Sequence, residues 1–292
     1  MRTTLAWPYS GQAIAAAMLL LSGCGDAPNR SEALKITGST TVNLPVADAA
    51  ELLRDRENLT IFVDTQGGSS GGVAAIGEGL AQLGMASRPI TQKDRDRFPD
   101  AEFVSVPIGS DALALVVSKD VWDGGIHDLD RAAVRGLYEG QVTNWKQLGG
   151  PDQTVVFFNK EPGRGTWEVF AKWLYGSAED APLVNHPEVG ANEEARSKVT
   201  STRGAISQLS AAWADGESVF ALGILNEERE VARPDLATVL AGRYPISRPL
   251  LLLTNGPATG DAKSFIDFMH SEEGQQLVAK HGYLPLGGSG AE

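Results

Sequence analysis

Three segments of the chain could each bind an anion, because each places glycine, serine or threonine where a predicted strand ends and a predicted helix begins. They are residues 34–42 (LKITGSTTV), 60–73 (TIFVDTQGGSSGGV) and 155–167 (VVFFNKEPGRGTW). Such a junction offers unpaired backbone N–H groups, hydroxyl donors and the positive end of a helix dipole. One junction of this kind is common. Three in one chain predict an oxyanion that is held from several sides.

The elements that would position these junctions alternate along the chain. Helices are predicted at 46–56, 73–83, 129–137, 166–175, 204–214, 262–269 and 273–280. Strands are predicted at 59–64, 103–106, 112–117, 154–158 and 248–254. Strands that alternate with helices predict an α/β fold with a mostly parallel sheet.

Two extended segments far apart in the sequence suggest a division into lobes. Residues 106–117 (VPIGSDALALVV) and 244–253 (YPISRPLLLL) both begin with proline-punctuated extended residues and continue as apolar runs. Two strands that cross between lobes would form a hinge, with a ligand cleft between the lobes. The alternative is that both are core strands of a single domain, and the residues alone leave this choice open.

The first residues of the chain are predicted to be a targeting signal. Arg2 is the only charged residue before Cys24, and the apolar run 13–21 (AIAAAMLLL) is too short to span a bilayer. Residues 21–24 (LSGC) resemble the bacterial lipoprotein signal, in which the cysteine becomes the lipidated first residue of the mature chain. We therefore predict a signal peptide at 1–23, lipidation of Cys24, and a polar tether at 24–33. An ordinary cleaved signal with a chance cysteine is the alternative.

The charge and composition of the chain argue against several classes of binding partner and against a metal site. The chain carries 25 basic and 37 acidic residues, and its formal net charge of −12 argues against nucleic acid and against polybasic docking to anionic lipid. An anion would therefore be held by local dipoles against a repulsive overall field. A single cysteine excludes an intramolecular disulfide. The four histidines lack metal-ligand spacing, so we predict no metal site and no cofactor.

The ordered set of short motifs resembles the periplasmic phosphate-binding proteins that feed ABC transporters, in their shorter, PstS-like form. The matching segments span residues 34–286, nearly all of the predicted mature chain, and are 38–42 (GSTTV), 67–72 (GGSSGG), 86–88 (ASR), 108–111 (IGSD), 138–145 (YEGQVTNW), 148–150 (LGG), 163–166 (GRGT), 244–250 (YPISRPL), 265–268 (FIDF), 273–275 (EGQ) and 282–285 (GYLP). Their number and order carry the resemblance, since no single motif is decisive.

The resemblance implies a two-lobe periplasmic-binding-protein fold, type II-like, in which each lobe has a central sheet flanked by helices and two strands form the hinge. We expect residues 34–110 with 248–292 in the first lobe and 111–247 in the second. The implied function is an extracytoplasmic, monomeric solute-binding protein, not an enzyme. It would capture inorganic phosphate between its lobes and deliver it to a membrane permease. It would be anchored to a bacterial membrane only by its lipid, facing the periplasm or the exterior.

Phosphate must lose most of its water in a closed cleft, and neutral donors can replace that water without net protein charge. The expected donors at the helix starts are Ser39, Thr40, Thr41, Ser69, Ser70, Gly71, Gly165 and Thr166. Each hydroxyl could instead cap its own helix. Ser87 and Arg88 end a predicted strand, where the guanidinium could bind phosphate with two parallel hydrogen bonds or form a surface ion pair.

Asp111 is predicted to accept the proton of monohydrogen phosphate. Sulfate has no such proton near neutral pH, so a carboxylate beside the ligand would reject it. The alternative is that Asp111 orients Arg88 or caps a turn.

The chain departs from the family pattern in residues 159–166 (NKEPGRGT). The family usually has arginine where Lys160 stands and serine where Arg164 stands. Lys160 keeps the charge but loses the bidentate geometry. Arg164 could relocate the cation to the other side of the turn, change the pocket and hence the preferred oxyanion, or point outward.

Three other functions remain open from the sequence. The ligand could be sulfate, molybdate or arsenate, and the protein could be a phosphate sensor without a transporter. More distantly, residues 67–71 (GGSSG) match the G-x-S-x-G motif of serine hydrolases, with Ser69 as nucleophile and His270 or His281 as base. A loop of glycine and serine matches that motif easily.

Overall fold

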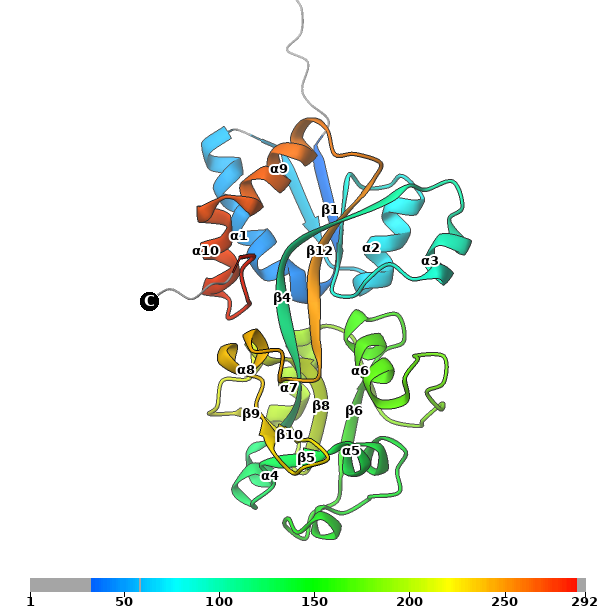
Figure 1. Ribbon diagram of the computed structural model, residues 1–292, viewed down its shortest axis with the longest axis vertical. Coiled ribbons are helices and arrows are strands. Elements are labelled where there is room, and N and C mark those ends of the chain that lie inside the picture. Colours follow the sequence, from blue (N-terminus) through cyan, green and yellow to red (C-terminus); the bar gives the residue numbers. More distant parts are fainter. Residues whose placement is uncertain (1–32, 58, 288–292) are drawn as a thin grey trace, which may run out of the picture. The chain divides into compact units, whose positions relative to one another are not determined.

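The computed structural model describes residues 33–57 and 59–287 (Figure 1). The predicted signal peptide, Cys24 and residues 24–32 of the predicted tether lie outside the described residues. In the described part, no helix combines the length and the apolar character needed to cross a membrane.

The elements alternate along the chain much as the sequence predicts. The strands are β1 (Leu34–Gly38), β2 (Ile61–Asp64), β3 (Leu83–Ala86), β4 (Phe103–Ser118), β5 (Asp128–Asp130), β6 (Val156–Lys160), β7 (Glu188–Val189), β8 (Ala205–Ser210), β9 (Val219–Ala221), β10 (Gly223–Leu225), β11 (Val231–Ala232) and β12 (Ser247–Asn255). The α-helices are α1 (Thr40–Glu57), α2 (Gly68–Gly77), α3 (Gln92–Arg97), α4 (Lys119–Asp123), α5 (Arg131–Tyr138), α6 (Gly165–Tyr175), α7 (Asn192–Ser201), α8 (Leu236–Leu240), α9 (Gly260–His270) and α10 (Glu272–Lys280). Two 3₁₀ turns, η1 (Trp145–Leu148) and η2 (Ala211–Trp213), complete the set.

One large sheet runs through the described residues in the order β2-β1-β3-β12-β4-β8-β6-β7, with β9 beside β4. The pairs β1–β2, β1–β3, β6–β8 and β6–β7 are parallel. The central pairs β3–β12, β12–β4, β4–β8 and β4–β9 are antiparallel. The prediction of a mostly parallel sheet is therefore wrong: the sheet is mixed, because two long antiparallel strands join its parallel ends.

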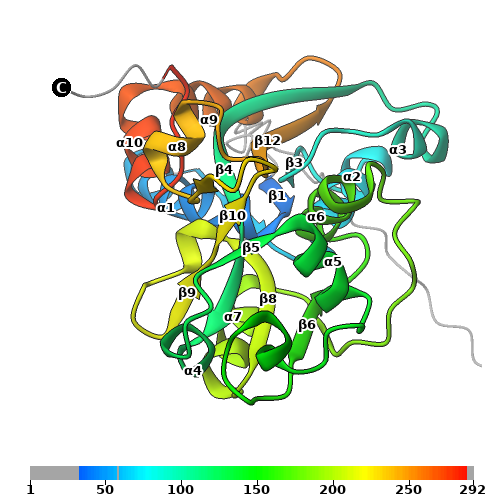
Figure 2. The same ribbon diagram turned by 60° about the horizontal axis from the view of Figure 1, so that its bottom comes forward.

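These two strands are the segments that the sequence singled out as a hinge. β4 and β12 pair from Phe103 opposite Asn255 to Ala112 opposite Ser247, with an irregularity between Leu250 and Leu251. Figures 1 and 2 show both strands running between an upper group of helices and a lower one. The prediction that both segments are strands is confirmed, and their pairing is an addition from the structure.

The buried side chains form separate cores at the two ends of these strands. One core packs α1, α9 and α10 against β1, β3 and β12, and includes Ile108 of β4. A second core packs α5 and α6 against the other half of β4, from Ala112 onward, with Phe157 of β6. The fold is thus a two-lobe α/β fold, and we call the halves around these cores the first and second lobes. We keep the lobe boundaries 34–110 with 248–292, and 111–247, as a proposal that this division of the cores supports.

The segment 204–214, predicted as a helix, is instead strand β8 followed by η2. All six residues of β8 are buried. The polar residues that suggested an amphipathic helix are hydrogen-bonded inside: Ser207 donates to the carbonyl of Phe158, and Gln208 donates to the Asn159 side chain. A central strand covered on both faces gives no alternating pattern, so its apolar residues did not distinguish strand from helix.

Helix α7 is the main element that the sequence did not predict. It begins at Asn192, inside a stretch that reads as polar and irregular, and it packs on β8. Only Asn192, Ala195 and Val199 of this helix are buried, so its apolar stripe is too narrow to stand out.

Candidate anion-binding site

The N-termini of four helices meet at one small hollow between the lobes. Helices α1 and α2 come from the first lobe, and α6 and α7 from the second. The hollow is lined by Ser39, Thr40, Thr41, Gly68, Ser69, Ser87, Arg164, Gly165, Thr166, Gly190 and Asn192, and its cavity volume is about 10 Å³. This is room for about one water-sized group, and a sugar or a peptide would not fit.

Three of the four helices begin without a side-chain cap. The residues before α2, α6 and α7 are Gly67, Arg164 and Ala191, and none of their side chains accepts a hydrogen bond from the first turn. No capping side chain therefore occupies the backbone N–H groups at these helix starts, which suits an anion, although in α2 those of Gly68 and Ser70 donate to the carbonyls of Thr65 and Gly163. Only the first helix shows the alternative of self-capping, where Ser39 Oγ accepts from the N–H of Val42 at 3.5 Å.

Serine hydroxyls from separate elements of the first lobe are bonded to one another at the hollow. Ser39 Oγ lies 3.1 Å from Ser87 Oγ, which lies 3.3 Å from Ser69 Oγ. Ser69 Oγ also accepts from the backbone N–H of Ser87 at 3.0 Å. All three serines are at most 3% exposed. The site thus holds pre-positioned hydroxyls that can turn toward an anion.

Two glycines permit the close approach of the junctions. Gly38 ends β1 with φ of +134°, and a Cβ there would lie 2.3 Å from the carbonyl oxygen of Met85. A Cβ on Gly165, the first residue of α6, would lie 2.5 Å from Ser69 Oγ and 2.8 Å from Ser87 Oγ. The second lobe therefore approaches the serine cluster of the first lobe only because residue 165 lacks a side chain.

A buried arginine that the sequence did not assign to the site links both lobes. Arg248 lies in β12, and its Nη1 donates to Thr166 Oγ1 at 2.7 Å while its Nη2 donates to Thr41 Oγ1 at 3.2 Å. Asn192 Nδ2 donates to the same Thr41 oxygen at 3.1 Å. Arg248 therefore stands directly behind two hydroxyls that line the hollow.

Asp111 is the carboxylate partner of Arg248 and does not line the hollow. Its Oδ2 accepts from Arg248 Nε at 2.9 Å, and its Oδ1 accepts from Ser210 Oγ at 2.8 Å. Burial raises the pKa of the Asp111 carboxyl, and the Arg248 guanidinium opposes that rise. The proposed role of Asp111 as acceptor of the ligand proton stays a prediction.

Arg164 is the cation that lines the hollow. Its Nη2 pairs with Glu161 at 2.9 Å, and its side chain is 18% exposed. A Cβ on Gly68 of the first lobe would lie 2.7 Å from its Cδ, and a Cβ on Gly190 would lie 2.6 Å from its Nη2. The side chain is thus held between two glycines at the hollow rather than extended into solvent.

Lys160 is buried and does not line the hollow. Its Nζ donates to the carbonyls of Gly190 and Ala191 at 3.0 and 2.9 Å, so it fixes the loop that begins α7. Burial, together with the nearby guanidiniums of Arg164 and Arg248, lowers the pKa of Lys160 to about 7.

Arg88 is also buried, but its guanidinium is bound by carboxylates. Nη1 and Nη2 donate to the two oxygens of Asp94 at 2.6 and 3.1 Å, and Nε lies 2.6 Å from Glu168 Oε2.

Eight of the thirteen residues predicted to bind phosphate line the hollow: Ser39, Thr40, Thr41, Ser69, Ser87, Arg164, Gly165 and Thr166. Five do not: Ser70, Gly71, Arg88, Asp111 and Lys160. Sequence reasoning missed Gly68, Gly190 and Asn192 at the hollow and Arg248 behind it. Arg248 stood in the quoted segment 244–250 and could have been found by pairing that segment with Asp111. Gly190 and Asn192 carried no comparable signal.

In the described part of the chain, the contacts of the residues concerned give little support to a metal site or to a serine-hydrolase site at the hollow. Among residues 33–57 and 59–287, no group of three or more His, Cys, Asp or Glu side chains is placed to hold a metal ion. His270 contacts the carbonyl of Pro107 and His281 contacts Asp48, while Ser69 Oγ contacts Ser87.

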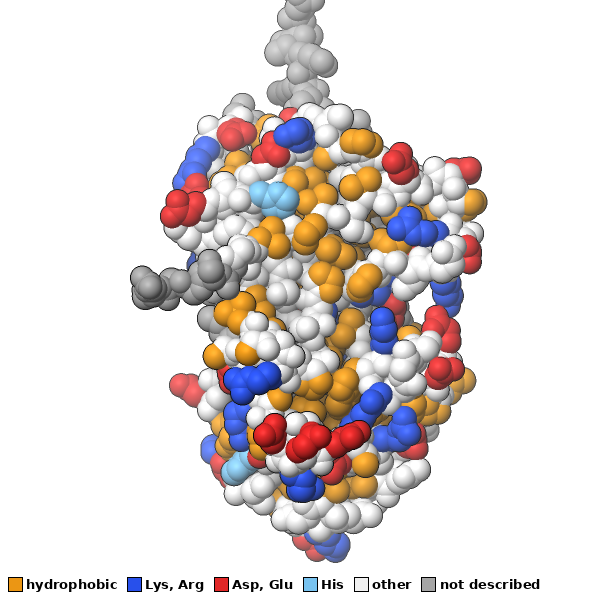
Figure 3. Space-filling model, viewed as in Figure 1, with side chains coloured by type: hydrophobic (Ala, Val, Ile, Leu, Met, Phe, Trp, Pro, Cys, Tyr) orange, Lys and Arg blue, Asp and Glu red, His pale blue; other side chains and the backbone are white. Residues whose placement is uncertain are grey.

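Figure 3 shows acidic and basic side chains interspersed on the face it presents, with hydrophobic side chains along its middle.

Comparison with known proteins identifies relatives over nearly the whole chain. A model described as a PBP superfamily domain matches residues 25–273. The phosphate-binding protein PstS of Bacillus subtilis is 28% identical over 289 residues, which cover 94% of this chain and 92% of that protein.

Solved structures give the same result. A Clostridium perfringens protein with bound phosphate, assigned as a substrate-binding protein of a phosphate ABC transporter, is 30% identical with a TM-score of 0.77. The match covers 87% of this chain and all of that one. An ABC-type phosphate transport receptor from Vibrio cholerae is 27% identical with a TM-score of 0.67, covering 86% of this chain and 99% of that one.

Proposed function

The chain belongs to the PBP superfamily, and from this premise we propose that it captures inorganic phosphate between its two lobes and delivers it to an ABC transporter. The observation that carries the proposal is the hollow where four helix N-termini meet, three of them without a side-chain cap. Its relatives named for phosphate binding support the choice of ligand.

In the proposed complex, the phosphate oxygens accept hydrogen bonds from the starts of α1, α2, α6 and α7 and from the hydroxyls of Ser39, Thr41, Ser69 and Thr166. Arg164 provides the positive charge at the rim of the hollow. Arg248 holds Thr41 and Thr166 from behind, and its charge favours an anion in the hollow even without contact. This assigns no ligand contact to Arg88 or Lys160, whose donors are engaged by other residues.

The proposed cycle needs no covalent chemistry. The lobes close on phosphate by bending at β4 and β12, the closed form docks on a membrane permease, and opening releases the ion. We propose that the protein acts as a monomer, attached outside the cytoplasm by a lipid on Cys24. Replacing Cys24 with alanine would then release the protein from the membrane fraction.

Calorimetric titration of the purified protein with phosphate, sulfate, arsenate and molybdate tests the proposal. We expect saturable one-to-one binding of phosphate, and of arsenate because it has the same charge and shape. Sulfate and molybdate should bind more weakly. Absence of saturable phosphate binding would overturn the proposal, and tighter binding of sulfate or molybdate would replace phosphate with that oxyanion.

A further inference from the structure

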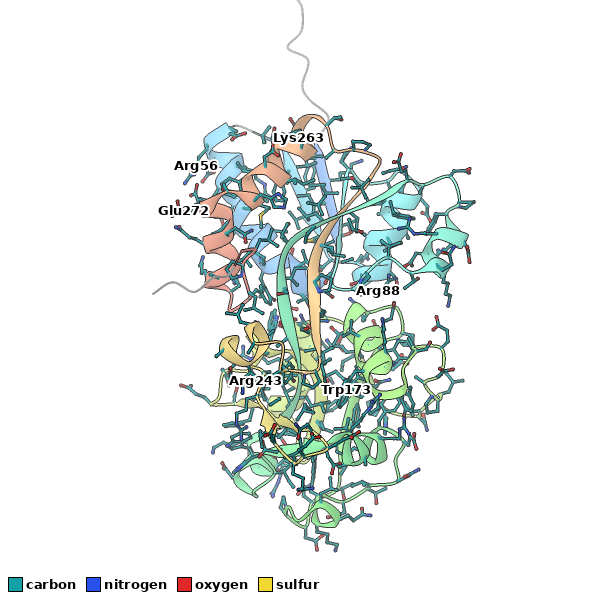
Figure 4. The ribbon with its side chains drawn as sticks, viewed as in Figure 1. Arg56, Arg88, Trp173, Arg243, Lys263 and Glu272 are labelled. Carbon is teal, nitrogen blue, oxygen red and sulfur yellow. The ribbon has the colours of Figure 1, made fainter. Side chains whose placement is uncertain are left out.

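The ion pair between Arg88 and Glu168 crosses from one lobe to the other outside the anion-binding hollow. Arg88 follows β3 in the first lobe, and Glu168 lies in the first turn of α6 in the second lobe. Their Nε and Oε2 atoms are 2.6 Å apart. Figure 4 labels Arg88 beneath α2 and α3, close to the top of α6. Neither residue lines the hollow.

The same region carries two further contacts between the lobes. The backbone N–H of Ser70 in α2 donates to the carbonyl of Gly163 at 3.1 Å. Ser70 Oγ donates to Glu168 Oε1 at 3.4 Å and accepts from Arg88 Nη2 at 3.2 Å. Figures 1 and 2 both place α2 beside α6. Ser70 therefore bridges the two charged groups at the edge where the lobes meet.

Separation of the lobes would leave Arg88 with an ion-pair partner but would take from Glu168 its contact with Arg88. Arg88 keeps a bidentate partner in Asp94, which belongs to α3 of the same lobe. Among the described residues, the cation paired with Glu168 lies across the interface, and the Glu168 side chain is 19% exposed while that of Arg88 is 4% exposed. Burial raises the pKa of the Glu168 carboxyl, and the Arg88 guanidinium opposes that rise. Opening would break the contacts of Glu168 with Arg88 and Ser70, so these contacts favour the state in which the lobes touch.

We propose that Arg88 and Glu168 form a latch that stabilises the closed arrangement of the lobes without touching the ligand. The ligand readout rests on the proposed function, whereas closure of the lobes can be measured without any ligand. A binding site that is complete only in the closed state has an apparent dissociation constant equal to the intrinsic one divided by the closed fraction. Glu168 therefore acts as a positioning residue that sets affinity through closure.

The first test uses small-angle X-ray scattering of ligand-free protein. Glu168→Gln removes the charge and keeps the shape, so we expect a larger radius of gyration than in the wild type. The matched control is Glu228→Gln, which removes the same charge at an exposed site in the turn between β10 and β11 of the second lobe. Equal radii for wild type, control and Glu168→Gln would overturn the latch.

The second test uses phosphate calorimetry. We expect Glu168→Gln to raise the phosphate dissociation constant about three- to tenfold, with the ratio of phosphate to sulfate affinity unchanged. Adding Arg88→Gln to Glu168→Gln should weaken binding little further, since either change breaks the pair. A large extra loss in the double variant would mean that Arg88 contacts the ligand, which contradicts the latch. If the wild type binds no phosphate while the scattering difference persists, the proposed function fails and the latch stands.

Discussion

Arg248 and Asp111 lie directly opposite each other on the two hinge strands, and their side chains form an ion pair of 2.8 Å that is at most 1% exposed. A strand pairing thus sets the position of a guanidinium that donates to hydroxyls of both lobes, Thr41 and Thr166. The hinge strands connect the lobes and also place the Arg248 guanidinium behind the hydroxyls that line the hollow.

Replacing Arg248 with methionine should abolish detectable phosphate binding and lower the free energy of unfolding by about 3–5 kcal/mol, because the Asp111 carboxylate would stay buried without its cation. Chemical denaturation and calorimetry measure the two effects. Combining Arg248→Met with Asp111→Asn should recover part of the stability but none of the affinity. Full affinity in either variant would contradict the role given to Arg248.

Replacing Asp111 with asparagine tests the proton-acceptor prediction. We expect the ratio of phosphate to sulfate affinity to fall, because an amide can also donate a hydrogen bond to an oxyanion that carries no proton. Competition calorimetry with both anions gives this ratio. Equal losses for phosphate and sulfate would show that Asp111 acts only by holding Arg248.

Replacing Gly165 with alanine should weaken phosphate binding about tenfold or more, because the added Cβ would lie 2.5 Å from Ser69 Oγ and keep the lobes apart. Gly136→Ala is a suitable control, since its Cβ would crowd only Val142, at 3.0 Å and within the second lobe. The control should change the melting temperature without changing affinity. Unaltered phosphate affinity in Gly165→Ala would mean that the lobes bind the ion without this close approach.

Lys160 should make the ligand-free protein more stable as the pH rises above neutral. Its pKa is about 7 in the folded protein and 10.5 as the ordinary value, so between these values the unfolded chain binds the additional proton. Stability then increases with pH, by about 2 kcal/mol at most between pH 7 and 9. Denaturant titrations of wild type and Lys160→Met at both pH values measure this. The same rise in the methionine variant would assign it to other groups.

The sequence was informative wherever the signal was local. The glycines and hydroxyls at 38–41, 67–71 and 163–166 predicted three helix starts for an anion, and residues of all three line the hollow. The apolar runs 106–117 and 244–253 predicted two hinge strands, which pair as β4 and β12. The helix starts depend on residues that are close in sequence. Each apolar run is long enough to be recognised as a strand by itself.

The residues next to a long charged side chain in the sequence did not determine which way that side chain points. Arg88, Lys160 and Arg248 are all buried cations near one another in the fold, and the sequence favoured the first two as ligand contacts. Arg88 is instead bound by Asp94 and Glu168, and Lys160 by the carbonyls of Gly190 and Ala191. Each guanidinium or ammonium points to the acceptors that the packing brings within reach. The partners named here for Arg88 and Lys160 lie 6 to 80 residues away along the chain, and those of Arg248 lie 82 to 207 residues away.

The sequence by itself determined that several helix starts are rich in glycine and hydroxyl groups, because the signals for a helix start lie in neighbouring residues. Only the tertiary structure decided which of its cations serves the site. Arg248 reaches Thr41 and Thr166 across separations of 207 and 82 residues, and the pairing of two distant strands brings these groups together.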